Sequence, residues 1–371
     1  MRRRAAVCGF IPPHMLRHIA AHATLDLSAH IRGERAALAL IPSLAVVAAG
    51  EKRRTIYDAD HKRALPGTRV RGEGDAKSKD DAVNEAYDAS GKTYDFYKKV
   101  FDRNSIDDRG MRLDSTVHFG TRFDNAMWNG RQMIYGDGDV KIFNRFTKSL
   151  DVIGHELTHG VTQFTAGLGF EDQPGALNEH FSDIFGTLVK QYSLKQSAKD
   201  ADWLIGAELL AKGVHGSGVR SMKAPGTAYD DPVLGKDPQP SHMNKYVHTD
   251  EDNGGVHINN GIPNVAFYRV AIAIGGRAWD VAGKIWYRAL TRKLRAASQF
   301  HDCAEATFEA AGELYGAGSE PQQAVLAAWK SVGIAIGEDD ARIPVKRRTR
   351  ELVIASAGAE VPADAKRLLR R

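Results

Sequence analysis

Cysteine is scarce in this chain, and long apolar runs are missing. Cys8 and Cys303 are the only cysteines among 371 residues, which excludes a framework of several disulfides. The apolar stretch of residues 36–49 is too short to span a bilayer and contains Pro42 and Ser43. The sequence therefore predicts neither a disulfide-stabilised scaffold nor a transmembrane segment.

A removable signal peptide is also missing. The start "MRRRAAV" is basic, but no continuous apolar core follows it, because Pro12 and Pro13 interrupt the sequence. We therefore expect synthesis in the cytoplasm without a recognisable signal peptide. Release by a non-classical route stays open.

A net positive charge occurs only at the two ends of the chain. The whole chain carries +5, of which residues 1–50 hold +4 and residues 341–371 hold +6, so residues 51–340 carry −5. The high isoelectric point therefore belongs to the ends, and no nucleic-acid partner is predicted. The basic run "KRRTR" at residues 346–350 is interpreted as part of a solvated tail, with contact to an acidic surface as the alternative.

The stretch "DVIGHELTHGVTQF", residues 151–164, places two histidines and a glutamate in an apolar helix. His155 and His159 are four residues apart and so project from nearly the same face, with Glu156 about 100° round. This H-E-x-x-H spacing is typical of two zinc ligands with a carboxylate that acts on the attacking water. The alternative is a pair of core histidines satisfied by hydrogen bonds, so the hypothesis needs a third ligand.

The stretch "GALNEHFSDIFGTLV", residues 175–189, offers that ligand on a second predicted helix. We assign Glu179 as the third zinc ligand. Asp183, one turn further on, is placed to accept the ring N–H of one histidine, and Asn178 could do the same for the other. The alternative is an amphipathic helix with solvated carboxylates.

A third motif, "DEDNGGVHINNG" at residues 250–261, presents a histidine after a flexible glycine pair. We predict that His257 donates a hydrogen bond to the oxyanion formed when water attacks an amide, with Asp252 orienting its ring. An ordinary loop histidine is the alternative.

Together these motifs resemble the thermolysin-like neutral metallopeptidases. From Leu65 to about Ile336, "NEAYDASGKTYDFY", "NAMWNG", "GHELTHGVT", "GALNEHFSDIFG", "RSM" and "DNGGVHINNG" occur in the family order. The resemblance implies a zinc ion on His155, His159 and Glu179, with Glu156 as base and then acid.

The same resemblance implies how a peptide binds. Arg220 would hold a substrate carbonyl, while Asn125 and the backbone of Ala126 would bind the chain beside the scissile bond. At the positions where the family lines the pocket for the residue that becomes the new N-terminus, this chain has apolar side chains. The resemblance therefore implies a preference for a bulky hydrophobic residue there; the positions are Phe143, Phe146, Val152, Ile205 and Val219.

Two departures from the family pattern affect the predictions. Phe170 stands where the family usually has a tyrosine supporting the oxyanion, so activity could be low. At the position of the family's double calcium site, Asp151 and Asp202 are kept, but Lys190, Leu204 and Ala207 are not calcium ligands by side chain. We predict that Lys190 replaces the cation, pairs with Asp151 and Asp202, and leaves the calcium double site absent.

The N-terminal stretch "CGFIPPHMLRHIAAH" resembles the short propeptide of the protealysin-like branch. Residues 1–52 are therefore interpreted as an inhibitory propeptide that folds onto its own enzyme in cis and is cut near "AAGEKRRT". Cys8 is a candidate zinc ligand that would block the site, because a thiolate binds zinc strongly. An inert thiol is the alternative.

The predicted architecture is a thermolysin-like two-lobe α+β peptidase. Residues 53–150 are expected to form a β-rich lobe, residues 151–337 the zinc-binding helices and a helical lobe, and residues 338–371 a basic tail. We predict a monomeric zinc metalloendopeptidase acting on peptide or protein substrates. A weakly active or inactive zinc protein that binds peptides or a partner is the alternative, and an aminopeptidase is disfavoured because no motif grips a free amine.

Overall fold

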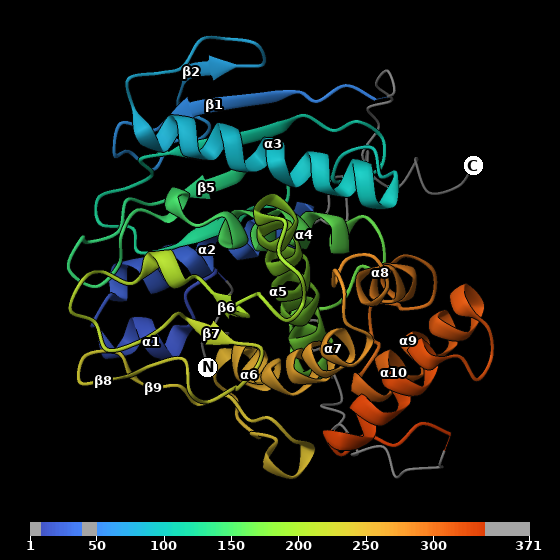
Figure 1. Ribbon diagram of the computed structural model, residues 1–371. Helices are drawn as coiled ribbons and strands as arrows, with labels where there is room; N and C mark the ends of the chain where they lie inside the picture. Colours follow the sequence, from blue (N-terminus) through green and yellow to red (C-terminus); the bar gives the residue numbers. More distant parts are fainter. Residues whose placement is uncertain (1–8, 39–49, 338–371) are drawn as a thin grey trace, which may run out of the picture. The chain divides into compact units, whose positions relative to one another are not determined.

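The computed structural model describes residues 9–38 and 50–337 (Figure 1). Cys8, the predicted basic tail at 338–371 and part of the predicted cleavage region lie outside these residues. The mixture of helices and strands confirms the predicted α+β class.

A five-stranded mixed sheet forms the first structural layer. Its strand order is β2-β1-β3-β5-β4, with β1, β3 and β5 parallel and the two edge strands antiparallel to their neighbours. The strands are β1 (Arg54–Asp58), β2 (Thr68–Gly72), β3 (Leu113–Val117), β4 (Ala126–Trp128) and β5 (Met133–Tyr135). Because β4 lies at an edge, its outer side can pair with another extended chain.

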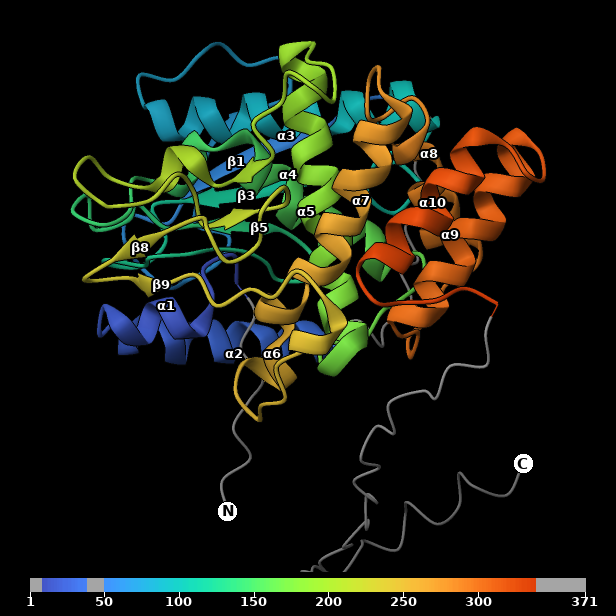
Figure 2. The ribbon, with the colours of Figure 1, turned by 60° about the horizontal axis from the view of Figure 1, so that its bottom comes forward.

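The helix α3 (Asp81–Phe101) lies along one side of this sheet, and it was not predicted from the strand and turn signals of residues 53–150. It begins after Asp80, whose carboxylate accepts from the backbone N–H of Ala82 at 2.7 Å. In Figure 2, α3 lies on one side of the sheet and the blue helices α1 (Pro13–His18) and α2 (His22–Leu38) on the other.

Two buried helices, α4 (Leu150–Gln163) and α5 (Asp172–Leu194), pack against each other in the middle of the described chain (Figure 1). They are the two helices that were predicted to hold the zinc ligands. The remaining helices follow in sequence and form a helical lobe beside α5; they are α6 (Asp252–Asn259), α7 (Gly261–Ile274), α8 (Ala282–Arg292), α9 (Phe300–Tyr315) and α10 (Glu320–Ser331).

Short elements connect α5 to α6. Two two-stranded ribbons occur here, β6 with β7 and β8 with β9. Their bounds are β6 (Leu204–Ile205), β7 (Arg220–Ser221), β8 (Asp230–Asp231) and β9 (Gly235–Lys236), and the 3-10 helices η2 (Ala207–Leu209) and η3 (Met243–Lys245) lie in the same region. A further 3-10 helix, η1 (Phe146–Lys148), precedes α4.

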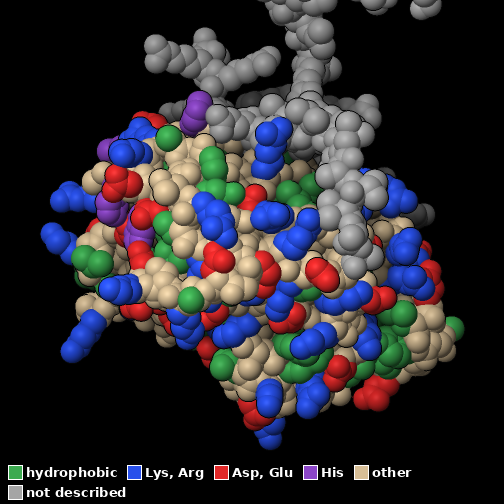
Figure 3. Space-filling model, turned by 90° about the horizontal axis from the view of Figure 1, so that it is seen from above, with side chains coloured by type: hydrophobic (Ala, Val, Ile, Leu, Met, Phe, Trp, Pro, Cys, Tyr) green, Lys and Arg blue, Asp and Glu red, His purple; other side chains and the backbone are tan. Residues whose placement is uncertain are grey.

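Charged side chains of both signs are interspersed on the face shown in Figure 3. This mixture agrees with the nearly balanced charge of residues 51–340. Over residues 9–38 and 50–337, we find no helix with the length and apolar character needed to cross a bilayer.

Candidate metal centre and peptide-binding cleft

Close contact between α4 and α5 brings the predicted ligands together. A Cβ atom added at Gly186 would lie 2.4 Å from the carbonyl oxygen of Asp151 and 2.9 Å from the backbone nitrogen of His155. Only glycine permits this approach, because no side chain separates the two helix backbones. The side chains of α4 therefore reach Glu179 on α5 directly.

The geometry of His155, His159 and Glu179 suits one metal ion. Their ligand atoms all lie within 4.8 Å of one another, and the three residues are buried. The two histidine Nε2 atoms lie 3.4 and 3.5 Å from the carboxylate oxygens of Glu179. Donors bound to a tetrahedral zinc at about 2.0–2.2 Å lie roughly 3.3–3.6 Å apart, so the spacing fits.

The buried Nε2 atom of His155 makes no hydrogen bond. A buried polar atom normally has a partner, and here the partner that the donor set fits is a metal ion. Each histidine is also held through its other ring nitrogen. Nδ1 of His155 lies 2.9 Å from Asp183 Oδ1, and Nδ1 of His159 lies 2.8 Å from Asn178 Oδ1 and 3.0 Å from Ser182 Oγ.

Asp183 is the centre of a buried hydrogen-bond network. It accepts from Arg220, through Nε at 2.9 Å and Nη2 at 2.8 Å, and from the side-chain amides of Asn260 and Asn264, each at 2.9 Å. Burial alone would raise the pKa of Asp183, but Arg220 and His155 hold that pKa well below its usual value. Asp183 therefore stays ionised beside the candidate metal centre.

Sequence reasoning assigned only part of this network. It gave Asp183 to a histidine and Arg220 to the substrate, but it did not pair the two residues with each other. Asn260 and Asn264 were missed, although Asn260 belongs to the quoted "VHINNG" run.

Glu156 lies beside the candidate centre and is 1% exposed. Its Oε2 accepts the backbone N–H of Trp128 at 2.8 Å, and its Oε1 lies 4.0 Å from Nε2 of His155. The carboxylate is thus held between the edge strand β4 and the candidate metal centre.

His257 reaches the centre from the turn that opens α6. Its Nδ1 and backbone nitrogen lie 2.7 and 2.8 Å from the two carboxylate oxygens of Asp252, and its Nε2 lies 3.5 Å from Glu179. Burial lowers the pKa of His257, but the carboxylates of Asp252 and Glu179 raise it above the ordinary value. Gly254 makes the turn possible, since its φ is +88° and a Cβ there would lie 2.2 Å from Asp172 Oδ1.

The N-terminal segment, residues 9–38, enters the cleft at Phe10. The backbone N–H of Phe10 donates to the carbonyl oxygen of Ala126 at 3.1 Å, and that of Ile11 donates to Asn125 Oδ1 at 2.9 Å. Nη1 of Arg220 donates to the carbonyl oxygen of Phe10 at 3.2 Å. The three groups predicted to bind a peptide therefore all hold this segment.

The ring of Phe10 is fully buried and forms a T-shaped pair with the ring of His155, with 5.3 Å between the ring centroids. A Cβ atom at Gly206 would lie 3.0 Å from the ring of Phe10 and 3.1 Å from Val219. The predicted pocket residues belong to the same buried apolar cluster; they are Phe143, Phe146, Val152, Ile205 and Val219.

Lys190 lies near the C-terminal end of α5. Its ammonium lies among three oxygen atoms from other segments of the chain. Its Nζ is 2.9 Å from Asp151 Oδ2, 3.1 Å from Asp202 Oδ1 and 2.8 Å from the carbonyl oxygen of Leu204. Burial lowers the pKa of Lys190, but the two carboxylates raise it above the ordinary value, so the ammonium stays charged.

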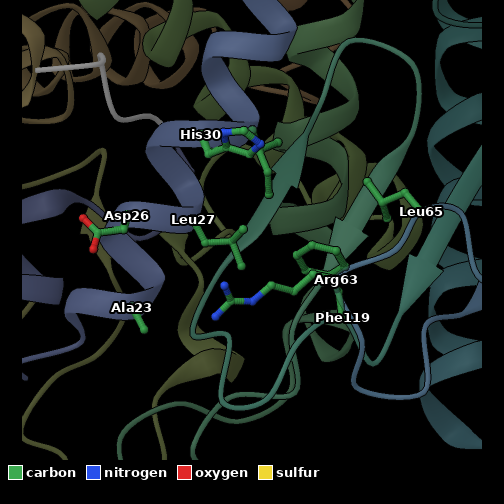
Figure 4. A pocket seen from close by; sticks show the side chains of 8 residues that line it. Ala23, Asp26, Leu27, His30, Arg63, Leu65 and Phe119 are labelled. Carbon is green, nitrogen blue, oxygen red and sulfur yellow. The ribbon is translucent and has the colours of Figure 1, made fainter. Parts of the chain in front are cut away.

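A separate cavity of about 710 Å³ lies between α2 and the body, away from the candidate metal centre (Figure 4). Asp26, Leu27 and His30 line it from α2, and Arg63, Leu65 and Phe119 line it from the opposite side. The packing of α2 on the body is therefore incomplete, whereas Phe10 fills its own site.

Comparison with known proteins agrees with this geometry. The model of the thermolysin metallopeptidase catalytic domain matches residues 46–163, and the model of the thermolysin metallopeptidase alpha-helical domain matches residues 166–334. The extracellular metalloprotease of Pectobacterium carotovorum subsp. carotovorum is 50% identical over 345 residues, which cover 90% of this chain and 98% of that protein.

Two further relatives agree. Protease PrtS of Photorhabdus sp. is 53% identical over 290 residues, covering 77% of this chain and 78% of that protein. The solved structure of the precursor of protealysin, a metalloproteinase from Serratia proteamaculans, is 51% identical, with a TM-score of 0.81 over 89% of this chain and 100% of that chain. The chain therefore belongs to the thermolysin metallopeptidase family and is a hydrolase acting on peptide bonds.

Proposed function

We propose that this enzyme is a zinc endopeptidase that cuts on the amino side of bulky hydrophobic residues and is made as a self-inhibited precursor. The proposal depends chiefly on one observation: the buried donor atoms of His155, His159 and Glu179 lie within 4.8 Å of one another, and Nε2 of His155 has no hydrogen bond. When bound there, zinc lowers the pKa of a water molecule and polarises the scissile carbonyl.

The chain's own residues perform the proton transfers and the positioning. Glu156 takes the proton of the attacking water and passes it to the leaving amine. His257, oriented by Asp252, donates to the oxyanion, and Arg220 holds the carbonyl of the residue that follows the scissile bond. Phe170 cannot donate, so we expect turnover to depend strongly on His257.

Specificity follows from the pocket. Phe143, Val152, Ile205 and Val219 are each at most 1% exposed, so a bulky apolar side chain that enters there leaves water completely. Burying such a side chain contributes about 1.5–3 kcal/mol. The aromatic ring of Phe10 supports the same preference, because it lies beside Gly206, where an added Cβ atom would also meet Val219.

Self-inhibition follows from competition for the same groups. Residues 9–38 use Ala126, Asn125 and Arg220, which a substrate would need, so both cannot bind together. Removal of residues 1–52 by a cut near "AAGEKRRT" would free these groups. A zinc switch by Cys8, monomeric assembly and absence of the calcium double site are further parts of the proposal.

The test is hydrolysis of casein and of a quenched peptide with a central Phe, by wild type and by Glu156→Gln. Wild type should cleave, lose activity in a zinc chelator and regain it with zinc, whereas Glu156→Gln should bind one zinc per chain and lose at least about 10³-fold in kcat. If wild type binds zinc but cleaves no better than Glu156→Gln after removal of its N-terminal segment, the peptide-binding alternative that Phe170 favours replaces this proposal.

A further inference from the structure

We propose that the Gly9–Phe10 peptide bond is a substrate of the chain's own cleft, so that the precursor cuts itself at this bond. The proposal rests on the proposed endopeptidase function and adds a specific self-processing site to it. This cut differs from the removal of residues 1–52, because the rest of the N-terminal segment stays in place.

The backbone of the segment runs through the cleft in the direction that a substrate would need. Phe10 donates its N–H to Ala126 and offers its carbonyl to Arg220, and Ile11 donates its N–H to Asn125. Arg220 is the group that we assign to the carbonyl of the residue after the scissile bond, and Asn125 and Ala126 are those that we assign to the chain beside that bond. A docked inhibitor of opposite direction would not satisfy all three at once.

The side chain of Phe10 fixes which bond is presented. It is 0% exposed, lies beside Gly206, where an added Cβ atom would also meet Val219, and forms a T-shaped pair with the ring of the candidate zinc ligand His155. If this pocket takes the residue on the carboxyl side of the cut, the bond on the amino side of Phe10 is the one presented for hydrolysis.

Gly9 allows the chain to pass close to Asn125. A Cβ atom at Gly9 would lie 2.4 Å from Nδ2 and 2.7 Å from Cγ of Asn125. Asn125 has little freedom to give way, because its Oδ1 accepts from Ile11 and its Nδ2 donates to Ser28 Oγ at 3.3 Å. The residue before the presented bond must therefore be glycine for the segment to dock as it does.

Water is the only reactant that this hydrolysis needs. Glu156 takes a proton from water, the water oxygen bonds to the carbonyl carbon of Gly9, and the bond from that carbon to the nitrogen of Phe10 breaks. The proton passes to that nitrogen, which leaves as an amine, and Gly9 ends as a carboxylate. The hydrogen bonds between Phe10 and Arg220 and between Ile11 and Asn125 remain, so residues 10–38 still cover the cleft.

The experiment follows the N-terminus of the purified full chain, saturated with zinc, by intact mass and N-terminal sequencing. Wild type should lose residues 1–9 and begin at Phe10, at a rate independent of protein concentration. Glu156→Gln should keep the bond, and Phe10→Ala should slow the cut by at least about tenfold because the pocket anchor is lost. Arg17→Ala, which removes an exposed ion pair with Glu251, should cut at the wild-type rate.

Docking is measured separately in the Glu156→Gln background. Hydrogen exchange at the amides of Phe10 and Ile11 should be slow, and it should speed up by at least about tenfold in Phe10→Ala but not in Arg17→Ala. If these amides are protected, the matured enzyme cleaves casein, and wild type still keeps residues 1–9, the inference is wrong while the proposed function stands. If neither casein nor the precursor is cut, the proposed function itself fails.

Discussion

Single side chains in the cleft each make contacts that serve two purposes, and Arg220 is the clearest case. Its Nε and Nη2 donate to Asp183, while its Nη1 donates to the carbonyl oxygen of Phe10. Asp183 also accepts from His155. The carboxylate that orients a candidate zinc ligand therefore also fixes the group that grips a peptide carbonyl.

Lys190→Met tests the proposed replacement of calcium. The change leaves Asp151 buried without its cation, so we expect the free energy of unfolding in urea to fall by about 3–5 kcal/mol. The exposed Lys199 provides the control, since Lys199→Met should change stability by less than about 0.5 kcal/mol. With zinc held constant, added calcium should leave the wild-type melting temperature unchanged; a rise that disappears when Asp151 is replaced would contradict the prediction.

Local spacing made some site residues predictable, and long-range packing hid others. His155, Glu156 and His159 fall in one helical turn, so their relation follows from the helix period. Asn260 and Asn264 reach Asp183 across 77 and 81 residues, and nothing in the sequence fixes that contact. In the N-terminal segment, the sequence suggested Cys8 as the residue near the zinc ligands. Among the described residues of that segment, the one whose ring contacts His155 is Phe10.

At the scale of elements, the contact between α4 and α5 sets the geometry of the candidate metal centre. We predict that Gly186→Ala destabilises the fold by about 1–3 kcal/mol and weakens zinc binding, because a Cβ 2.4 Å from the carbonyl oxygen of Asp151 must push the helices apart. Thermal melting and competition with a chelator measure the two effects.

Gly283→Ala is the matched control for this change. Its Cβ would meet the end of the Leu188 side chain at 3.0 Å, and a side-chain end can move where a helix backbone cannot. We expect zinc affinity to stay at the wild-type value in this variant. Equal losses in both variants would show that close backbone contact is not what positions the ligands.

Helices were more predictable than strands for a physical reason. Apolar periodicity over ten or more residues indicated α7, α8 and α9. The spacing of the motif residues indicated α4 and α5, which are buried on nearly all sides. The strands β6 to β9 have two residues each and carry no period, and α3 was overlooked because turn signals around it favoured a sheet. The division at residues 53 and 151 stays a prediction.

His118 joins the N-terminal cap of α3 to the turn after β5. Its Nε2 lies 2.8 Å from Asp80 and its Nδ1 2.9 Å from Asp137, and these hydrogen bonds, Asp137's first, raise its pKa to about 9. The stabilisation is complete below about pH 6.5 and is lost as pH rises through about 9. Between pH 7 and 10 the free energy of unfolding should fall about 1–2 kcal/mol more in wild type than in His118→Gln. Parallel pH profiles would refute the assignment.

At the scale of the whole molecule, we predict that docking of α2 is coupled to protonation of Asp124. Thr24 Oγ1 on α2 accepts the backbone N–H of Asp124 at 3.3 Å, and the buried Oδ1 of Asp124 has no hydrogen bond. Burial raises the pKa of Asp124 from 3.8 to about 7, Asp139 adds to the rise, and Arg122 opposes it. The docked state thus holds a proton that an exposed carboxyl would release.

The sign of the effect follows from that difference in pKa. Docking should weaken as pH rises from about 4 and level off above about 7, because ionised Asp124 is costly only while it is covered. In Glu156→Gln, exchange at Phe10 and Ile11, corrected for the intrinsic rate, should be about tenfold less protected at pH 7.5 than at pH 5. Asp124→Asn should remove this dependence, and an unchanged slope in that variant would assign it to another group.

The bond between Arg220 and the carbonyl of Phe10 has a practical consequence for inhibitor discovery. A compound that needs Arg220 can bind only those molecules whose cleft is momentarily vacated, and its apparent dissociation constant rises in inverse proportion to that fraction. Screening libraries against the uncut chain would therefore rank good compounds as weak ones. The enzyme from which residues 1–52 have been removed would report their true affinity.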